Sequence, residues 1–155
     1  MKKVISLVLV LLFMTVGCGK NDEKDFYLTY HEKDLFLNRE YNEDIYGKSN
    51  DSFESESCAF GNKDITYMYD DIEIEAYGND DGKLIVYSIY FTGDDVSTNE
   101  GIKLYDEIDD AIKIYGNDYT KEDNKYTYYR NNTSLIFITE NDIIRNIEYR
   151  IRDIA

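Results

Sequence analysis

The stretch Tyr105-Asp-Glu-Ile-Asp-Asp-Ala-Ile-Lys-Ile-Tyr-Gly116 carries the clearest helix signal in this chain of 155 residues. Its apolar residues follow helical spacing, at Ile108, Ala111, Ile112 and Tyr115. Asp106 is expected to cap the helix at its start, and Gly116 to end it with a positive φ. The stretch therefore predicts a helix that turns one apolar stripe toward a core.

A fainter copy of this pattern occurs earlier, at Asn38-Arg-Glu-Tyr-Asn-Glu-Asp-Ile-Tyr-Gly47. Both copies end in Ile-Tyr-Gly. Asn38 is the expected cap, Tyr41 and Ile45 share one face, and Gly47 is the expected end. The echo suggests one small unit that is used twice.

Strand-like segments follow each Ile-Tyr-Gly, marked by alternation of apolar and polar residues and by turn residues such as those of Asn79-Asp-Asp-Gly82. The expected strands are 26–30, 35–37, 57–60, 64–69, 71–77 and 83–92, then 101–104, 125–129, 134–139 and 142–152. Residues 48–56 are expected to form a polar loop. The predicted fold class is α+β, with two tandem repeats that each contain a helix and a three-stranded antiparallel meander, packed as one compact domain.

The predicted organisation divides the chain into five parts. Residues 1–17 read as a signal peptide and 18–25 as a lipidated tether. The first α+β repeat is expected at 26–92, a linker at 93–100 and the second repeat at 101–155.

The first residues have the composition of a secretory leader. Lys2 and Lys3 precede an apolar run from Val4 to Met14, which is too short for a comfortable transmembrane helix. A small residue, Gly17, lies directly before Cys18, which resembles a bacterial lipobox. That resemblance implies a diacylglycerol group on the Cys18 sulfur and a membrane-anchored protein on the extracytoplasmic side, with a Gram-positive envelope as the expected setting. The alternative is an ordinary secreted protein with a chance cysteine.

Composition narrows the classes of partner. The formal net charge is −15, from 32 acidic and 17 basic side chains. Such a surface repels nucleic acid and anionic lipid headgroups, so neither is expected as a partner. The 16 Tyr and 7 Phe indicate a packed, strand-rich core despite the high charge.

A series of short motifs runs through most of the chain beyond the leader, in the order Cys58-Ala-Phe60, Tyr67-Met-Tyr69, Ile72-Glu-Ile74, Val86-Tyr-Ser-Ile-Tyr-Phe91, Gly101-Ile102, Tyr115-Gly116, Asp118-Tyr-Thr120 and Ile147-Glu-Tyr149. This order resembles the uncharacterised small lipoproteins of gut clostridia, a resemblance that implies no activity. The repeat of a helix and three strands is similar, in fold only, to β-lactamase-inhibitor-protein-like units and to the small outer-membrane lipoprotein of the β-barrel assembly machinery. Those resemblances imply protein binding through a sheet face and its loops.

The leading hypothesis is therefore a non-enzymatic module that binds an extracytoplasmic protein, a peptide or an envelope component. Tyr is favoured at protein interfaces, and the chain holds more tyrosines than a core of this size needs. The candidate binding face consists of Tyr67, Tyr69, Glu73, Glu75, Tyr77, Tyr87 and Tyr90. The alternative for each tyrosine is an ordinary place in a half-buried strand.

Catalytic and metal chemistry find little support in the sequence. His31 is the single histidine and lies in an expected turn, so neither a catalytic triad nor a transition-metal site is predicted, and no cofactor is expected. One alternative is a carbohydrate-active enzyme or another hydrolase accessory that uses Glu73 and Glu75, since both share one strand face. A second is weak calcium binding by acidic loops in a structural lipoprotein. Cys58 is expected to be a small half-buried residue rather than a reactive thiol.

Overall fold

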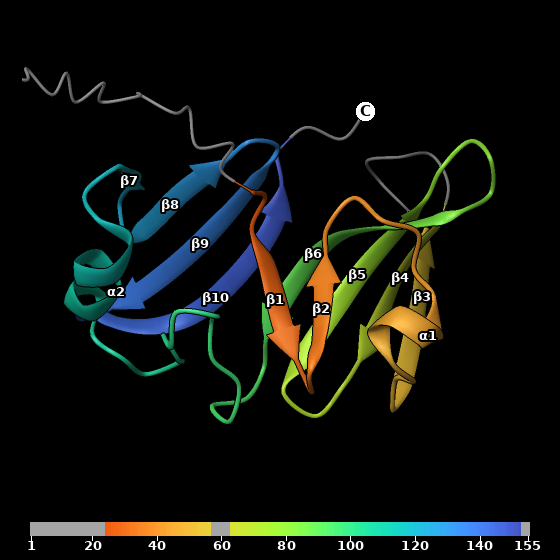
Figure 1. Ribbon diagram of the computed structural model, residues 1–155, viewed down its shortest axis with the longest axis horizontal. Helices are drawn as coiled ribbons and strands as arrows, with labels where there is room; N and C mark the ends of the chain where they lie inside the picture. Colours follow the sequence, from red (N-terminus) through yellow and green to blue (C-terminus); the bar gives the residue numbers. More distant parts are fainter. Residues whose placement is uncertain (1–23, 57–62, 153–155) are drawn as a thin grey trace, which may run out of the picture.

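The computed structural model describes residues 24–56 and 63–152 and contains one large antiparallel sheet of eight strands (Figure 1). The strands are β3 (Asp51–Glu56), β4 (Lys63–Met68), β5 (Ile72–Gly78), β6 (Leu84–Phe91), β7 (Tyr119–Glu122), β8 (Lys125–Arg130), β9 (Thr133–Glu140) and β10 (Ile143–Ile151). Their order across the sheet is β3-β4-β5-β6-β10-β9-β8-β7. The sheet thus consists of two meanders that meet at β6 and β10.

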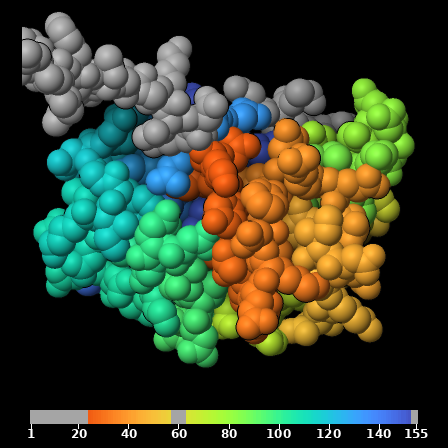
Figure 2. Space-filling model, viewed as in Figure 1, coloured from red at the N-terminus to blue at the C-terminus, as the bar shows by residue number. Residues whose placement is uncertain are grey.

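The remaining elements form a second layer on one face of this sheet. They are a hairpin of β1 (Tyr27–Tyr30) and β2 (Lys33–Phe36), and the helices α1 (Glu43–Tyr46) and α2 (Ile108–Tyr115). All four lie in front of the sheet in Figure 1. Figure 2 shows the hairpin in the middle of this face, with the segment that includes α2 on one side and the α1 region on the other.

The hydrophobic core lies between the two layers. Leu28 and Leu35 of the hairpin are fully buried, as are Ile74, Ile89 and Ile147 of the sheet. Each such side chain contributes roughly 1.5–3 kcal/mol by its burial. A three- or four-stranded meander has one apolar face that needs a cover, and the hairpin and helices supply it.

The two halves of the molecule repeat the same local contacts. The Asn38 amide donates to the Val86 carbonyl at 2.8 Å, and the Tyr105 amide donates to the Ile144 carbonyl at 2.9 Å. Asn38 and Tyr105 also share a positive φ, of 55° and 73°. In each half, the segment before the helix is thus hydrogen-bonded near the start of the last strand of that half, which is β6 for α1 and β10 for α2.

The ends of the helices are matched as well. The Tyr69 hydroxyl donates to the Gly47 carbonyl at 3.1 Å, and the Tyr128 hydroxyl donates to the Gly116 carbonyl at 2.9 Å. Both glycines have a positive φ, of 82° and 85°, as expected for residues that end a helix. The Ile-Tyr-Gly echo therefore marks equivalent places in the two halves.

The predicted α+β class is wrong, because the protein is mostly β. Its two helices have four and eight residues, and each half contributes four strands, not three, to one continuous sheet. The missed strands are β3, within the expected loop 48–56, and β7. β3 is exposed at every position, and both strands lie at an edge of the sheet, so neither shows the apolar alternation that marks a strand in sequence.

Several details near the helices also differ from expectation. Asn42, rather than Asn38, caps α1, and its side chain accepts from the amides of Asp44 and Ile45. α2 begins after Glu107, and the Asp106 carboxylate instead accepts from the Lys103 amide. Residues 101–104 form no strand. The apolar stripe of α2 is confirmed, since Ile108 and Ala111 are buried against the core.

Several predictions fall on residues outside the described ranges. They are the leader 1–17, the lipidated Cys18, most of the tether, the strand at 57–60 and the role of Cys58. Within residues 24–56 and 63–152, no helix has the length and apolar character needed to cross a membrane.

Candidate functional site

The eight-stranded sheet has a covered face and an open face. Contacts from the second layer reach the covered face, as between Phe26 and Tyr149, Tyr41 and Tyr67, and Tyr115 and Phe137. Successive side chains of a strand point to opposite faces, so the residues between these positions form the open face. No described helix or hairpin packs there, and we therefore take the open face as the candidate binding surface.

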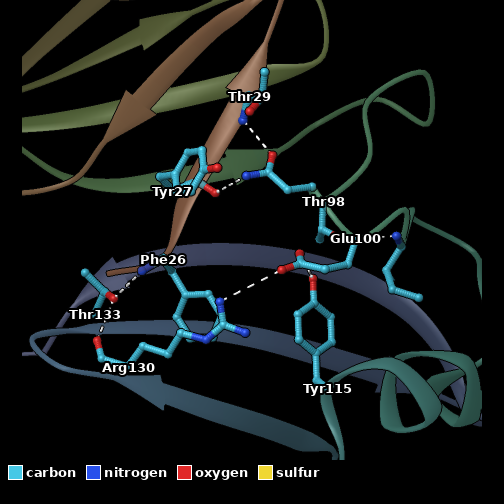
Figure 3. A network of polar contacts seen from close by, with 10 residues as sticks. Phe26, Tyr27, Thr29, Thr98, Glu100, Tyr115, Arg130 and Thr133 are labelled. Carbon is cyan, nitrogen blue, oxygen red and sulfur yellow. Dashed lines mark hydrogen bonds and ion pairs between the residues drawn. The ribbon is translucent and has the colours of Figure 1, made fainter. Parts of the chain in front are cut away.

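The contacts beneath the second layer are structural. In Figure 3, Glu100 points between Tyr115 and Arg130, and its carboxylate accepts from the Tyr115 hydroxyl at 2.6 Å. The Arg130 guanidinium lies 3.9 Å from the same carboxylate and 4.2 Å from the centre of the Phe26 ring. These contacts tie the segment after β6 to α2 and β8, and so they close the covered face.

The centre of the open face carries a cluster of acidic, hydroxyl and aromatic groups, which we call the central cluster: Glu75, Tyr87, Ser88, Tyr90 and Glu148. Strand register brings it together, since Glu75 lies opposite Ser88, and Tyr90 lies opposite Glu148. The Ser88 hydroxyl donates to the Glu148 carboxylate at 3.0 Å. Tyr87 donates to Glu75, and Tyr90 donates to Glu148.

Burial changes the acid–base properties of this cluster. It raises the pKa of Glu75, against a lowering by the Tyr87 hydrogen bond, and the nearby Glu148 carboxylate raises that pKa further. Burial, with the charges of Glu148 and Glu75, also raises the pKa of Tyr90 to about 12. The pKa of Tyr87 is raised by burial and by Glu75. Both tyrosines therefore remain neutral hydrogen-bond donors over the physiological range of pH.

A basic hollow lies beside the central cluster on the same face. Its volume is about 410 Å³, and its lining comes from β8, β9, β10 and the residue that follows β10: Lys125, Thr127, Tyr129, Ser134, Ile136, Arg150, Ile151 and Arg152. Arg150 joins the two regions, because its guanidinium lies 3.3 Å from the Glu148 carboxylate. The open face therefore carries an acidic centre and a cationic hollow side by side.

The residues of the open face are more enclosed than an uncovered flat sheet would allow. Ser88 is 0% exposed, Thr127 is 3% exposed and Glu148 is 6% exposed. Ser134 and Ile136, which line the basic hollow, are also buried. The open face is therefore not a flat, fully exposed surface, and the basic hollow is one depression in it.

Five of the seven predicted binding-face residues lie together on the open face: Glu73, Glu75, Tyr77, Tyr87 and Tyr90. Tyr67 and Tyr69 lie on the covered face instead. The Tyr67 ring stacks on Tyr41 with 3.6 Å between the ring centres, and Tyr69 bonds to the carbonyl at the end of α1. The structure thus separates two of the tyrosines from the other five residues.

Sequence reasoning missed the residues that β10 and β8 bring to the face, above all Glu148, Arg150 and Lys125. The alternation in Ile147-Glu-Tyr-Arg-Ile151 does place Glu148 and Arg150 on one side of a strand. No signal in the sequence gave the pairing of β10 with β6, however, and only that pairing sets Glu148 beside Ser88 and Tyr90.

Metal-binding and histidine chemistry have no evident place on this face. Among the described residues, no group of three His, Cys, Asp or Glu side chains comes together as metal ligands. His31 lies in the turn between β1 and β2, against the Tyr30 ring, and far in sequence from the central cluster.

No family model, no curated protein and no solved structure matches this chain.

Proposed function

We propose that this protein is a non-enzymatic binding module, anchored to the outer side of a cell membrane through lipid on Cys18, which holds a protein, peptide or envelope component on the open face. One observation carries the proposal. The second layer packs entirely on one face of the sheet, and the other face is hollowed and lined with tyrosines and charged groups.

The chemistry of the open face suits recognition. Tyr87, Tyr90 and Tyr129 offer aromatic area together with a hydroxyl, a combination that favours binding at low entropic cost, whereas Tyr77 is buried beside Tyr87. Most of the charged groups in the centre already have hydrogen-bond partners within the protein. Their orientation is therefore fixed before a ligand arrives, which lowers the cost of binding.

A photocrosslinking experiment in the producing cell tests this proposal. A photoreactive phenylalanine would replace Phe53 or Tyr129, two exposed aromatic residues on the open face, or Phe36, an exposed aromatic residue on the hairpin. We expect a discrete adduct from Phe53 and Tyr129 and none from Phe36. Equal adducts at all three positions, or none at the two open-face positions, would contradict the proposal.

A second function, hydrolysis of a glycan, is favoured by one observation, the raised pKa of Glu75. A carboxyl group with a raised pKa can act as a general acid, and a second carboxylate must lie nearby. The structure supplies that neighbour as Glu148, in addition to the expected Glu73. If the purified protein releases reducing ends from envelope glycan, and Glu75→Gln abolishes the release, this function replaces the first. If the unaltered protein releases no reducing ends, the hydrolysis hypothesis is wrong.

A further inference from the structure

We infer that the basic hollow holds a carboxylate of an extended peptide segment, whose cationic side chain lies four residues away against Glu75. This inference rests on the proposed function and names the chemistry of the ligand. Three observations carry it: the fixed cations of the hollow, the charge balance around them, and the spacing between the hollow and Glu75.

The cations of the hollow are held in place by their own neighbours. The Arg152 guanidinium lies 4.5 Å from the centre of the Tyr129 ring and donates to the Asn131 carbonyl at 3.2 Å. A planar guanidinium has five N–H donors, so several remain for a ligand. The Thr127 hydroxyl lines the same space, whereas the Ser134 hydroxyl there already donates to the Arg150 carbonyl at 3.2 Å. An anion in the hollow would therefore meet donors that are already oriented.

The basic hollow gathers positive charge in a protein that is strongly negative overall. The chain has a net charge of −15 and only 17 basic residues, and three of them line the hollow. Lys125 has Glu122 at 3.4 Å and Arg150 has Glu148 at 3.3 Å. Among the described residues, no carboxylate pairs with Arg152. Of the three cations that line the hollow, Arg152 is therefore the one whose charge can pair with a ligand carboxylate.

The surrounding acidic groups favour a single negative charge over a double one. Coulomb repulsion from Glu122, Glu148 and the net charge of the chain grows in proportion to the charge of the ligand. The attraction of the cations grows with the charge of the ligand as well, so the local balance of charge decides. Lys125 and Arg150 already have carboxylate partners, so the one uncompensated cation, Arg152, matches a single negative charge. The guanidinium fork also matches the two oxygens of a carboxylate. These terms assign a carboxylate to the hollow.

The spacing across the sheet indicates an extended peptide. Glu75, Ser88, Arg150 and Ser134 form one row of directly opposed residues on β5, β6, β10 and β9. Neighbouring strands lie about 4.8 Å apart, so the row spans roughly 14 Å. Residues i and i+4 of an extended peptide point to the same side and also lie about 14 Å apart. A peptide with a basic residue at i and an acidic residue at i+4 therefore matches Glu75 at one end and the hollow at the other.

Blocked pentapeptides test the inference with the full chain, kept in solution by mild non-ionic detergent. The probe is N-acetylated, C-amidated Lys-Ala-Tyr-Ala-Asp, and its affinity is measured by chemical-shift titration. Replacement of the peptide Asp by Asn should weaken binding by about fivefold, since an exposed ion pair contributes up to about 1 kcal/mol and 1.4 kcal/mol is tenfold. Replacement of the peptide Lys by Gln should have a similar effect.

Variants of the protein then locate the carboxylate. Arg152→Gln should weaken binding of the Asp peptide by about fivefold and leave the Asn peptide unchanged. Lys113→Gln removes the same charge from the exposed side of α2, and it should change neither. Equal weakening of both peptides by Arg152→Gln, or an equal effect of Lys113→Gln, would overturn the inference. Tighter binding of a phosphoserine peptide than of the Asp peptide would also overturn it.

The failure of this inference can be told from the failure of the proposed function. Crosslinked adducts at Phe53 and Tyr129, together with equal affinities for the Asp and Asn peptides, would reject the carboxylate site and leave the binding module in place. The absence of those adducts would reject the binding module, and the peptide site with it.

Discussion

The Ser88 hydroxyl on β6 donates a hydrogen bond of 3.0 Å to the Glu148 carboxylate on β10, across the seam between the two halves of the sheet. Ser88 is 0% exposed and Glu148 is 6% exposed. The bond joins residues 60 positions apart, and Arg150 reaches the same Glu148 oxygen at 3.3 Å. A charged group is thus kept inside the open face by partners from both halves.

Ser88→Ala should destabilise the protein. The substitution removes a donor from a buried carboxylate, which costs about 1.5–3 kcal/mol of the free energy of unfolding for a bond to a charged group. Equilibrium unfolding in urea measures the change. Ser55→Ala on the exposed edge strand β3 is the matched control and should stay within about 0.5 kcal/mol of the parent. Equal losses at the two sites would show that the Ser88–Glu148 bond contributes nothing specific.

Glu75→Gln should make the protein more stable at pH 7. Burial raises the pKa of Glu75 above its ordinary value of 4.5, so the folded state binds this proton more tightly than the unfolded state. As pH rises through 4.5 toward the raised pKa, the unfolded state loses its proton first, and stability falls. Gln carries no charge and avoids this loss.

The melting temperature of Glu75→Gln should therefore exceed that of the parent at pH 7, and the two should converge below about pH 4, where Glu75 is protonated in both states. Thermal scans at several pH values measure this. Glu73→Gln removes the same charge two residues along β5 and serves as the control. A lower melting temperature for Glu75→Gln at pH 7 would show that the Tyr87 hydrogen bond outweighs the burial of the charge.

Tyr69→Phe and Tyr128→Phe should each lower the free energy of unfolding by about 0.5–1.5 kcal/mol. Each removes one hydroxyl that donates to the carbonyl of the glycine at a helix end, Gly47 or Gly116. Urea unfolding of both variants compares the two halves directly. In Tyr129→Phe the lost hydroxyl makes only a long contact of 3.3 Å with Thr120, and we expect little change. The Tyr69 hydroxyl also bonds to the Tyr41 hydroxyl at 3.1 Å, so Tyr69→Phe should cost at least as much as Tyr128→Phe, and a loss in Tyr128→Phe alone would contradict the expectation.

Cys18→Ala should release the protein from the membrane fraction of the producing cell. A lipid-modified cysteine holds a protein through its acyl chains, and stable anchoring needs two such chains. Fractionation followed by immunoblotting measures the distribution, which should shift almost fully to the soluble fraction. A variant that stays with the membrane would show that another segment provides the anchor.

The sequence predicted the strands of the core better than those at the edges. β5 alternates apolar and polar residues from Ile72 to Ala76 and β10 does so from Ile147 to Ile151, and the expected ranges 71–77 and 142–152 lie within one residue of the observed bounds. In β3, with Asp-Ser-Phe-Glu-Ser-Glu, every residue is exposed, so nothing in its pattern separates it from a polar loop. The α+β assignment failed because of these edge strands and because α1 is much shorter than its echo suggested.

Only part of the candidate site could be predicted from the sequence. Alternation along β5 correctly placed Glu73, Glu75 and Tyr77 on one side. Tyr67 and Tyr69 also share one side of their segment, but no local pattern showed that this side meets α1. The basic hollow depends on three strands that pair over long sequence distances, and such pairing is a property of the whole chain.

The place of β10 bears on the order in which the chain can fold. It comes after every other described strand in sequence, yet it lies in the middle of the sheet, between β6 and β9. Until residues 143–151 are in place, β6 has an unpaired inner edge and the first meander has no partner. Joining the two meanders pairs β6 with β10, which brings together residues about 60 positions apart in sequence, and contacts between such distant parts of a chain favour slow folding.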